Sequence, residues 1–267
     1  MTSLLYIQLL TSFIVGGSAI ALLSLLAEKV DKKVAGIITS LPLTVVISFI
    51  FVAWSTSPKT IGMIAPATLA TESSNMIFAI VYMYLAKIKT TRFVSIILSL
   101  FGGLTAWFIL SVPLAKYKFT NLPLGIIFTV LAIALAYYLF AIKNREKPPA
   151  ELLTYTTSQK IGRAVIAGLV ISLTIFLSKI LNPFWGGIFS GFPAGYTSTF
   201  LILHWYYGSN MLFKIARALP VGGLLYSIYI LACHWTFPAY GIFGGTIFAY
   251  LVYLLFLFIY LKISKRT

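Results

Sequence analysis

One acidic residue lies within a long apolar stretch of the sequence and is the first candidate for chemistry. Glu72 is about halfway along the stretch at 61–86, whereas the other acids fall between apolar stretches. On a helix, Thr68 and Asn75 would share its face, at positions i−4 and i+3. A carboxylate removed from water is costly, so it should face a protein interior and bind a proton, a cation or a hydrogen-bond donor. The alternative is a structural acid that hydrogen-bonds a neighbouring helix.

Glycine, hydroxyl residues and proline recur together in two segments, 36–42 and 187–193, that could interrupt a helix. Proline removes a backbone donor and clashes with the preceding turn, and nearby Gly, Ser and Thr can satisfy the freed groups. A break would offer bare carbonyls to a cation or helix N-termini to an anion. The alternative is that small residues only let helices pack closely. The candidate binding residues in and beside these segments are Thr39, Ser40, Pro42, Ser190, Gly191, Pro193 and Thr197.

Two basic residues form a third candidate. Lys214 and Arg217 lie three positions apart and would share nearly one face of a helix. They could meet an anionic headgroup or substrate, and Arg217 could pair with Glu72 across the core. The alternative is that both extend to the water interface as ordinary anchors.

The composition decides what kind of molecule must position these residues. Of 267 residues, 60% are hydrophobic, 16% aromatic and only 9% charged, whereas an ordinary soluble domain is about half apolar and about a quarter charged. A water-facing globule of this size needs more polar surface than that. The composition therefore excludes a soluble enzyme, a disordered chain and a nucleic-acid-binding domain, despite the net charge of +15. We expect an all-α polytopic membrane protein.

About 20 largely apolar residues are needed to cross a bilayer, and nine stretches meet that criterion. The only candidate linker is the segment 143–160, so there is no room for a soluble domain. The expected spans are 4–27, 34–55, 61–86, 93–114, 122–142, 162–181, 184–207, 211–234 and 239–261.

Basic residues are divided very unequally between the two sides of these spans. Of the 20 Lys and Arg, all but four follow spans one, three, five, seven and nine. Positive charge favours the cytoplasmic side, so we expect a cell (plasma or inner) membrane protein with its N-terminus outside and its C-terminus in the cytoplasm. The four exceptions are Lys59, Lys116, Lys118 and Lys179.

A shift of 151 residues superposes the two halves of the sequence. In that register the segment 36–42 falls on 187–193, with shared glycine and proline, and Trp54 falls on Trp205. Five expected spans separate equivalent points, so the halves should enter the membrane from opposite faces, as in the inverted repeats of many secondary transporters.

The expected organisation is therefore a first four-helix repeat at 1–120, a connector helix and cytoplasmic linker at 121–160, and a second four-helix repeat at 161–267. In this register Glu72 falls on Gly223. Any site built on the acid must then be asymmetric.

One unit of the repeat has an Ala/Ser-Lys opening, an aromatic residue or Val before Ala/Gly-Gly-Ile, a proline about six residues later and a downstream Ala-Arg-Ala. The second half reads Lys-Ile-Ala-Arg-Ala at 214–218, whereas the first half has Pro66 where the arginine would stand. The pattern resembles the GlpM-like family of small four-span membrane proteins. The resemblance implies a fused duplicate of a unit that could elsewhere pair with itself, and it leaves a homodimer of this chain open.

Several kinds of chemistry lack the residues that they need. One cysteine, Cys233, and one aspartate, Asp31, exclude disulfides, cysteine-based metal sites and paired-aspartate transferase motifs. Ser190 lacks the flanking glycine of a serine-protease motif and has no evident base. We expect His204 and His234, each beside a tryptophan, to be polar tips of interfacial aromatic belts. We therefore expect no catalysis, no cofactor and no metal site.

The combination of inverted halves and one mid-membrane acid favours a secondary transporter for a small solute or ion, with proton coupling through Glu72 as one form of it. The expected partners are the lipid bilayer and a small-molecule, ion or lipid substrate, with no nucleic acid. Two alternatives stay open: a flippase or scramblase for an anionic lipid-linked intermediate, and a non-transporting component of a membrane assembly. Placement of Ser190, Thr197 and Glu72 around one buried cavity would count against the lipid alternative.

Overall fold

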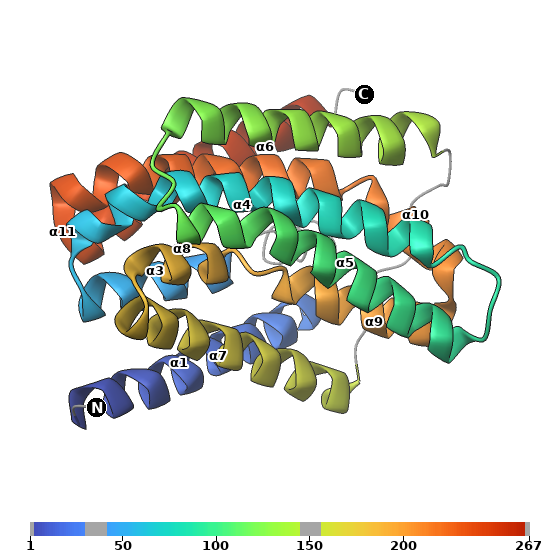
Figure 1. The fold of residues 1–267 in the computed structure, drawn as a ribbon, viewed down its shortest axis with the longest axis horizontal. Coiled ribbons are helices and arrows are strands. Elements are labelled where there is room, and N and C mark those ends of the chain that lie inside the picture. The colour runs from blue at the N-terminus through green and yellow to red at the C-terminus, as the bar shows by residue number, and fades with distance from the viewer. Residues whose placement is uncertain (1–2, 30–41, 145–155, 265–267) are drawn as a thin grey trace.

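Apolar helices lying roughly side by side make up the described part of the molecule in the computed structural model (Figure 1). The structure describes residues 3–29, 42–144 and 156–264, and all its regular elements in these ranges are helical. The helices are α1 (Ser3–Lys29), α3 (Leu43–Ser55), α4 (Pro58–Leu85), α5 (Arg92–Lys116), α6 (Leu122–Tyr137) with the π-helical turn η1 (Tyr138–Lys143), α7 (Thr157–Ile180), α8 (Pro183–Ser190), α9 (Ala194–Tyr207), α10 (Ser209–Ala216) and α11 (Leu219–Ser264).

Six of these helices are long and apolar enough to cross a membrane, which confirms the expectation of an all-α polytopic membrane protein. The expected second span is described only from residue 42 onward, as the short apolar helix α3. The six spanning segments are Leu4–Leu23, Pro58–Leu85, Arg92–Lys116, Leu122–Lys143, Thr157–Ile180 and Leu219–Ile263.

The longest segment, α11, is two helices that fold back on each other. Gly241 interrupts it with φ 72° and ψ −164°, a conformation that glycine adopts without a steric penalty. On either side of this turn, the rings of Tyr229 and Tyr250 lie with centroids 5.4 Å apart, and Thr236 Oγ1 donates to the carbonyl of Gly245 at 2.9 Å. The second half of α11 matches the expected span 239–261. The expected span 211–234 is wrong at its start, because α10 ends at Ala216 and the first half of α11 begins only at Leu219.

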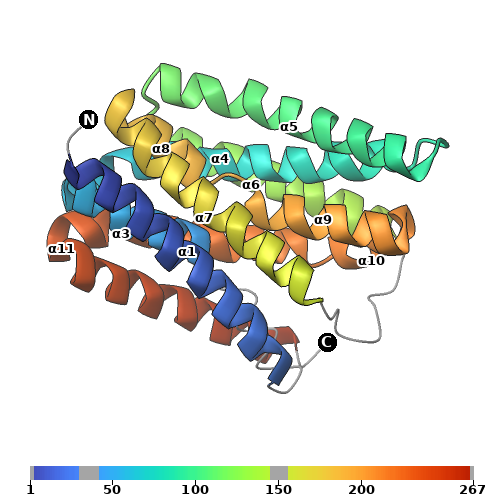
Figure 2. The same ribbon diagram turned by 90° about the horizontal axis from the view of Figure 1, so that it is seen from below.

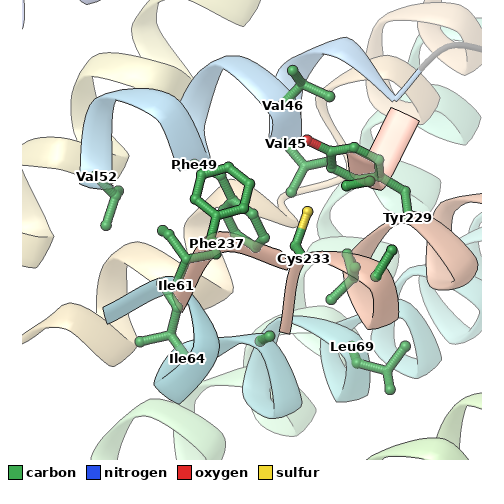
Figure 3. Close-up of a cluster of buried hydrophobic side chains, with 14 of the residues drawn as sticks. Val45, Val46, Phe49, Val52, Ile61, Ile64, Leu69, Tyr229, Cys233 and Phe237 are labelled. Carbon is green, nitrogen blue, oxygen red and sulfur yellow. The ribbon is translucent and has the colours of Figure 1, made fainter. Parts of the chain in front are cut away.

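Helix α4 lies at the centre of the bundle and contacts α5, α6, α8 and α11. Most of its residues are buried, as expected for a helix that is covered on every side rather than facing lipid. Figure 3 shows the apolar core that it forms with α3 and α11, where the rings of Phe49 and Phe237 meet edge to face with centroids 6.3 Å apart. Ile61 and Ile64 of α4 pack in the same cluster.

Helix α4 continues through Pro66 because a histidine supplies the missing donor. A proline at this position removes the hydrogen bond that the carbonyl of Gly62 would accept within the helix. His234 Nδ1 lies 2.7 Å from that carbonyl oxygen, and because a carbonyl can only accept, the histidine donates. His234 is therefore more than a polar tip in an aromatic belt: it ties α11 to α4 at this point.

The expected interruption is present in the second Gly/Ser/Pro segment. Helix α8 ends at Ser190, and α9 begins at Ala194, immediately after Pro193. Helix α3 likewise begins immediately after Pro42. The two prolines have nearly the same conformation, with φ −81° and ψ 50° at Pro42 and φ −76° and ψ 47° at Pro193.

Helix starts repeat at the offset found in the sequence. Moved back by 151 positions, the first residue of α9 falls on that of α3, and the first residue of α10 falls on that of α4. The offset of 151 is therefore a property of the structure as well as of the residue types.

Helices α1 and α7 pack closely against each other through glycines (Figure 2). A Cβ on Gly17 would lie 3.0 Å from the carbonyl oxygen of Ala164, and a Cβ on Gly168 would lie 2.7 Å from that of Phe13. The contacts run antiparallel and are reciprocal: Phe13 and Gly17 each meet the residue 151 positions on from the other. Reciprocity of this kind marks a two-fold relation between two surfaces.

Candidate functional site

A cavity of about 270 Å³ lies where the first turns of α3 and α9 meet α4 and α11. The junction between α8 and α9 forms another part of its wall, and Glu72 of α4 lies in its lining. Six of the residues proposed from the sequence come together here. They are Pro42, Glu72, Asn75, Ser190, Gly191 and Pro193.

The lining repeats itself across the two halves of the chain. Several lining positions differ by 151, so the same part of each half faces the same space. A position and its equivalent face one another only close to a two-fold axis. This pairing of lining positions is what a two-fold relation between the halves would produce, as is the antiparallel contact of α1 and α7. The pairs are Pro42 and Pro193, Thr44 and Gly195, Val45 and Tyr196, and Asn75 and Tyr226.

The carboxyl group of Glu72 is held by a chain of hydrogen bonds. The side chain is 1% exposed, and its Oε2 accepts from Asn75 Nδ2 at 2.8 Å. Asn75 Oδ1 in turn accepts from Trp107 Nε1 at 2.9 Å. Because the indole nitrogen can only donate, it fixes which end of the amide faces Glu72. By donating to Asn75 Oδ1, Trp107 orients the amide so that its NH₂ group, and not its oxygen, faces Glu72 Oε2.

The other carboxyl oxygen, Glu72 Oε1, has no hydrogen-bond partner among the described residues. It lies against Gly223, where an added Cβ would be 2.6 Å away. Gly223 is the position 151 residues on from Glu72, so the acid faces its own equivalent. Glu72 Oε1 occupies the space that a side chain at position 223 would need.

Two helix N-termini face the cavity. Pro42 and Pro193 begin α3 and α9 without any side-chain cap, and the residues of both first turns belong to the lining. The first backbone N–H groups of a helix have no partner within it, and they carry partial positive charge from the helix dipole. The two starts together create a region suited to a negatively charged group.

Arg163 of α7 also lines the cavity, although no pattern in the sequence distinguishes it from the other basic residues that favour the cytoplasmic side. In the structure it is half-buried, and its Nη1 donates to Thr199 Oγ1 of α9 at 3.0 Å. Arg163 and Glu72 are far apart in the chain, so no local pattern in the sequence predicts that they line one cavity.

The carbonyl of Gly187 in α8 accepts hydrogen bonds from two hydroxyl groups, one of them from α4. Thr68 Oγ1 donates to the carbonyl of Gly187 at 3.0 Å, and Ser190 Oγ donates to the same carbonyl at 2.6 Å. Gly187 also lies close to Ile64, since a Cβ on it would be 3.1 Å from Ile64 Cβ. Thr68 therefore acts one turn away from the cavity, by fixing α8 against α4.

The remaining candidates lie elsewhere. Thr39 and Ser40 fall outside the described residues. Thr197 is buried without a hydrogen-bond partner among the described residues and does not line the cavity. Arg217 is exposed just after the end of α10, whereas Glu72 is buried, so the structure does not bring these two side chains together.

His204 differs from its expected place in an interfacial belt. Its side chain is buried, with Nδ1 3.4 Å from the hydroxyl of Tyr82 and Nε2 3.3 Å from that of Ser95. It therefore joins α9 to α4 and α5 inside the bundle. In the described part of the chain, no group of three His, Cys, Asp or Glu side chains is placed to hold a metal ion.

Comparison with known protein families matches the first part of the chain. A DUF3147 domain covers residues 9–121. That family is described as "Protein of unknown function (DUF3147)", and the matched region coincides closely with the expected first repeat at 1–120. The match does not test the resemblance to GlpM-like proteins. No curated protein and no solved structure matches the chain.

Proposed function

We propose that this chain is a secondary transporter for a small solute, with its substrate site in the cavity between two inverted halves. The observation that carries the proposal is the pairing of lining residues at an offset of 151, including Pro42 with Pro193 and Asn75 with Tyr226. A site on a two-fold axis in the membrane plane has equivalent surroundings on both sides. Rocking of one half against the other can then open it to either side in turn.

The relation between the halves rests on three separate observations. Helices α1 and α7 cross antiparallel with reciprocal glycine contacts, helix starts recur at the same offset, and Glu72 faces Gly223. These observations support a duplicated chain whose second copy is inverted. The cell membrane, with the N-terminus outside, remains the location and orientation that the basic residues favour.

Glu72 is the group that we assign to coupling. Glu72 lines the cavity, and its carboxyl group is buried, with one oxygen held by Asn75 and the other against Gly223. The other polar and charged residues of the lining are Asn75 of α4, Thr44 of α3, Ser190 of α8, Tyr196 of α9, Tyr226 of α11 and Arg163 of α7. A proton or a cationic group on Glu72 would change the charge of the cavity as the substrate enters or leaves.

The lipid alternative has less support. A lipid-moving protein needs polar residues along a groove on the outside of the bundle, whereas Glu72 and Ser190 come together in one cavity at the starts of α3 and α9. Arg217, the candidate for a lipid phosphate, lies apart from that cavity. Thr197, which we expected beside Glu72 and Ser190, does not line the cavity and favours neither alternative.

Reconstituted vesicles test the proposal. With an imposed pH gradient and an internal pH-sensitive dye, the natural protein should show proton flux that depends on added solute, and Glu72→Gln should abolish that dependence. Arg217→Gln is the matched control, because it also removes one charge but at an exposed site away from the cavity. Equal flux and pH dependence in the natural protein and Glu72→Gln would remove Glu72 from the mechanism.

A further inference from the structure

We infer that the cavity binds a small zwitterion, with an ammonium group at Glu72 and a carboxylate at the starts of α3 and α9. This inference rests on the proposed function and adds to it the chemical class of the substrate. One ligand of this kind can meet both the buried carboxyl group and the helix starts of the lining.

The ammonium end is defined by the carboxyl group of Glu72, which lines the cavity and has one oxygen, Oε1, without a partner in the described part of the chain. This oxygen belongs to a buried side chain and has no hydrogen-bond partner among the described residues, whereas Oε2 accepts from Asn75. A buried carboxylate with an open acceptor is stabilised most by a charged donor. An ammonium group offers three donors and a compensating charge.

A hydroxyl group adjoins this end of the cavity. The Tyr226 hydroxyl also has no hydrogen-bond partner in the described part of the chain, and it lies 3.1 Å from the position of a Cβ on Gly191. A hydroxyl oxygen can accept one of the remaining ammonium donors. The glycine at the helix break leaves room for that hydroxyl.

The carboxylate end is defined by the two helix starts. Pro42 and Pro193 provide no side-chain acceptor for the first turns of α3 and α9, and both turns line the cavity. In α9 the N–H of Ala194 donates to the carbonyl of Phe192 at 2.7 Å, so the N–H groups of Gly195 and Tyr196 are the ones proposed to meet the carboxylate. N–H groups at a helix start, with the positive end of the dipole behind them, form a favourable site for an anionic group. Half-helix starts at the centre of a membrane protein bind substrate carboxylates in this way.

The two ends of the cavity select opposite charges on one ligand. The buried carboxyl group of Glu72 favours a charged donor, and the starts of α3 and α9 favour an anionic group. A monoanion or a monocation would satisfy one of these two ends, whereas a zwitterion satisfies both.

The size and walls of the cavity limit the rest of the ligand. Its volume of about 270 Å³ is below the range of roughly 300–1,000 Å³ for drug-sized ligands. Phe192, Tyr196 and Tyr226 supply aromatic surface around the polar groups. The chemistry therefore fits a short amino acid with few additional atoms.

Binding to the purified full-length chain in lipid nanodiscs tests this directly. The probes are glycine, β-alanine and γ-aminobutyrate, each compared by calorimetry with its N-acetyl form, which is an anion, and its amide, which is a cation. At least one zwitterion should bind about tenfold or more tightly than both of its blocked forms, as expected when one charged hydrogen-bonding group is lost. Binding of an N-acetyl form or an amide as tight as that of its zwitterion would overturn the inference, as would no binding by any of the three zwitterions.

The variant Glu72→Gln locates the ammonium end. It should weaken binding of the preferred zwitterion by about tenfold or more, because it removes the negative charge and keeps the shape. Ser111→Ala, a buried site outside the cavity lining, is the control and should leave the affinity unchanged. If Glu72→Gln binds the zwitterion as the natural protein does, the placement of the ammonium group is wrong.

A fold defect in Glu72→Gln is excluded by gel filtration and by the helical signal in circular dichroism. As a second route to the same oxygen, Gly223→Ala places a methyl group against Glu72 Oε1 and should weaken the zwitterion in the same direction. Solute-dependent proton flux without zwitterion binding would overturn the inference and leave the transporter proposal standing. Zwitterion binding without any flux would support the site and refute the transporter proposal.

Discussion

The most informative stability experiment changes the glycine that faces Glu72. In Gly223→Ala the new Cβ would lie 2.6 Å from Glu72 Oε1 and 2.9 Å from Met76 Cε. The end of Met76 can move, but Glu72 is held through Asn75 to Trp107, so the carboxyl group has to give up that geometry. Overpacking of a well-filled interior typically costs about 1–3 kcal/mol.

The neighbouring glycine supplies the matched control. A Cβ on Gly222 would meet no atom within 4 Å, so Gly222→Ala makes the same chemical change one residue away without a clash. Alanine is also favoured over glycine within a helix by about 0.5–1 kcal/mol. Gly223→Ala should therefore be less stable than Gly222→Ala by about 1–3 kcal/mol, measured by denaturant unfolding in mixed micelles with tryptophan fluorescence.

A double-mutant cycle identifies the clashing partner. If the methyl group acts through the carboxyl of Glu72, Glu72→Ala should cost less in the Gly223→Ala background than in the natural protein, with a coupling of about 0.5–3 kcal/mol. Equal stability of Gly222→Ala and Gly223→Ala, or strict additivity in the cycle, would refute the close approach of these two residues.

Two further predictions test the contacts that order the bundle. His234→Phe leaves the backbone carbonyl oxygen of Gly62 without its donor and should lower the free energy of unfolding by about 1–3 kcal/mol. An unchanged free energy of unfolding in the same micelle assay would show that this carbonyl needs no partner. Ser12→Cys with Ser172→Cys should form a disulfide within one chain on mild oxidation, because the two hydroxyl oxygens lie 3.2 Å apart. With Cys233 replaced by serine, failure to cross-link would contradict the antiparallel crossing of α1 and α7.

Patterns along the chain were sufficient to predict several features. Apolar length and composition predicted the membrane-spanning helices, and proline with glycine predicted the interruption before α9. The offset of 151 predicted that Glu72 and Gly223 are equivalent positions, although only the structure places them in contact. These features are local, or they repeat, so one sequence can reveal them.

Contacts between helices far apart in the chain could not be predicted in this way. Trp107 fixes Asn75 from a different helix, Arg163 reaches the cavity from α7, and His234 supplies a donor that Pro66 removes. Each depends on the mutual rotation and depth of two helices, which apolar periodicity leaves undetermined in a chain so uniformly hydrophobic. A tryptophan or histidine within a span signals only that its polar atom needs some partner.

The contact between Glu72 and Gly223 bears on whether such a site could be built from two separate copies of one half. Two identical polypeptides related by a two-fold axis would bring either a pair of carboxyl groups or a pair of glycines to this point. The first arrangement is opposed by mutual repulsion, and the second has no acid. A single oriented carboxyl group at the axis requires two non-identical halves, and joining them in one polypeptide guarantees that every molecule receives one of each.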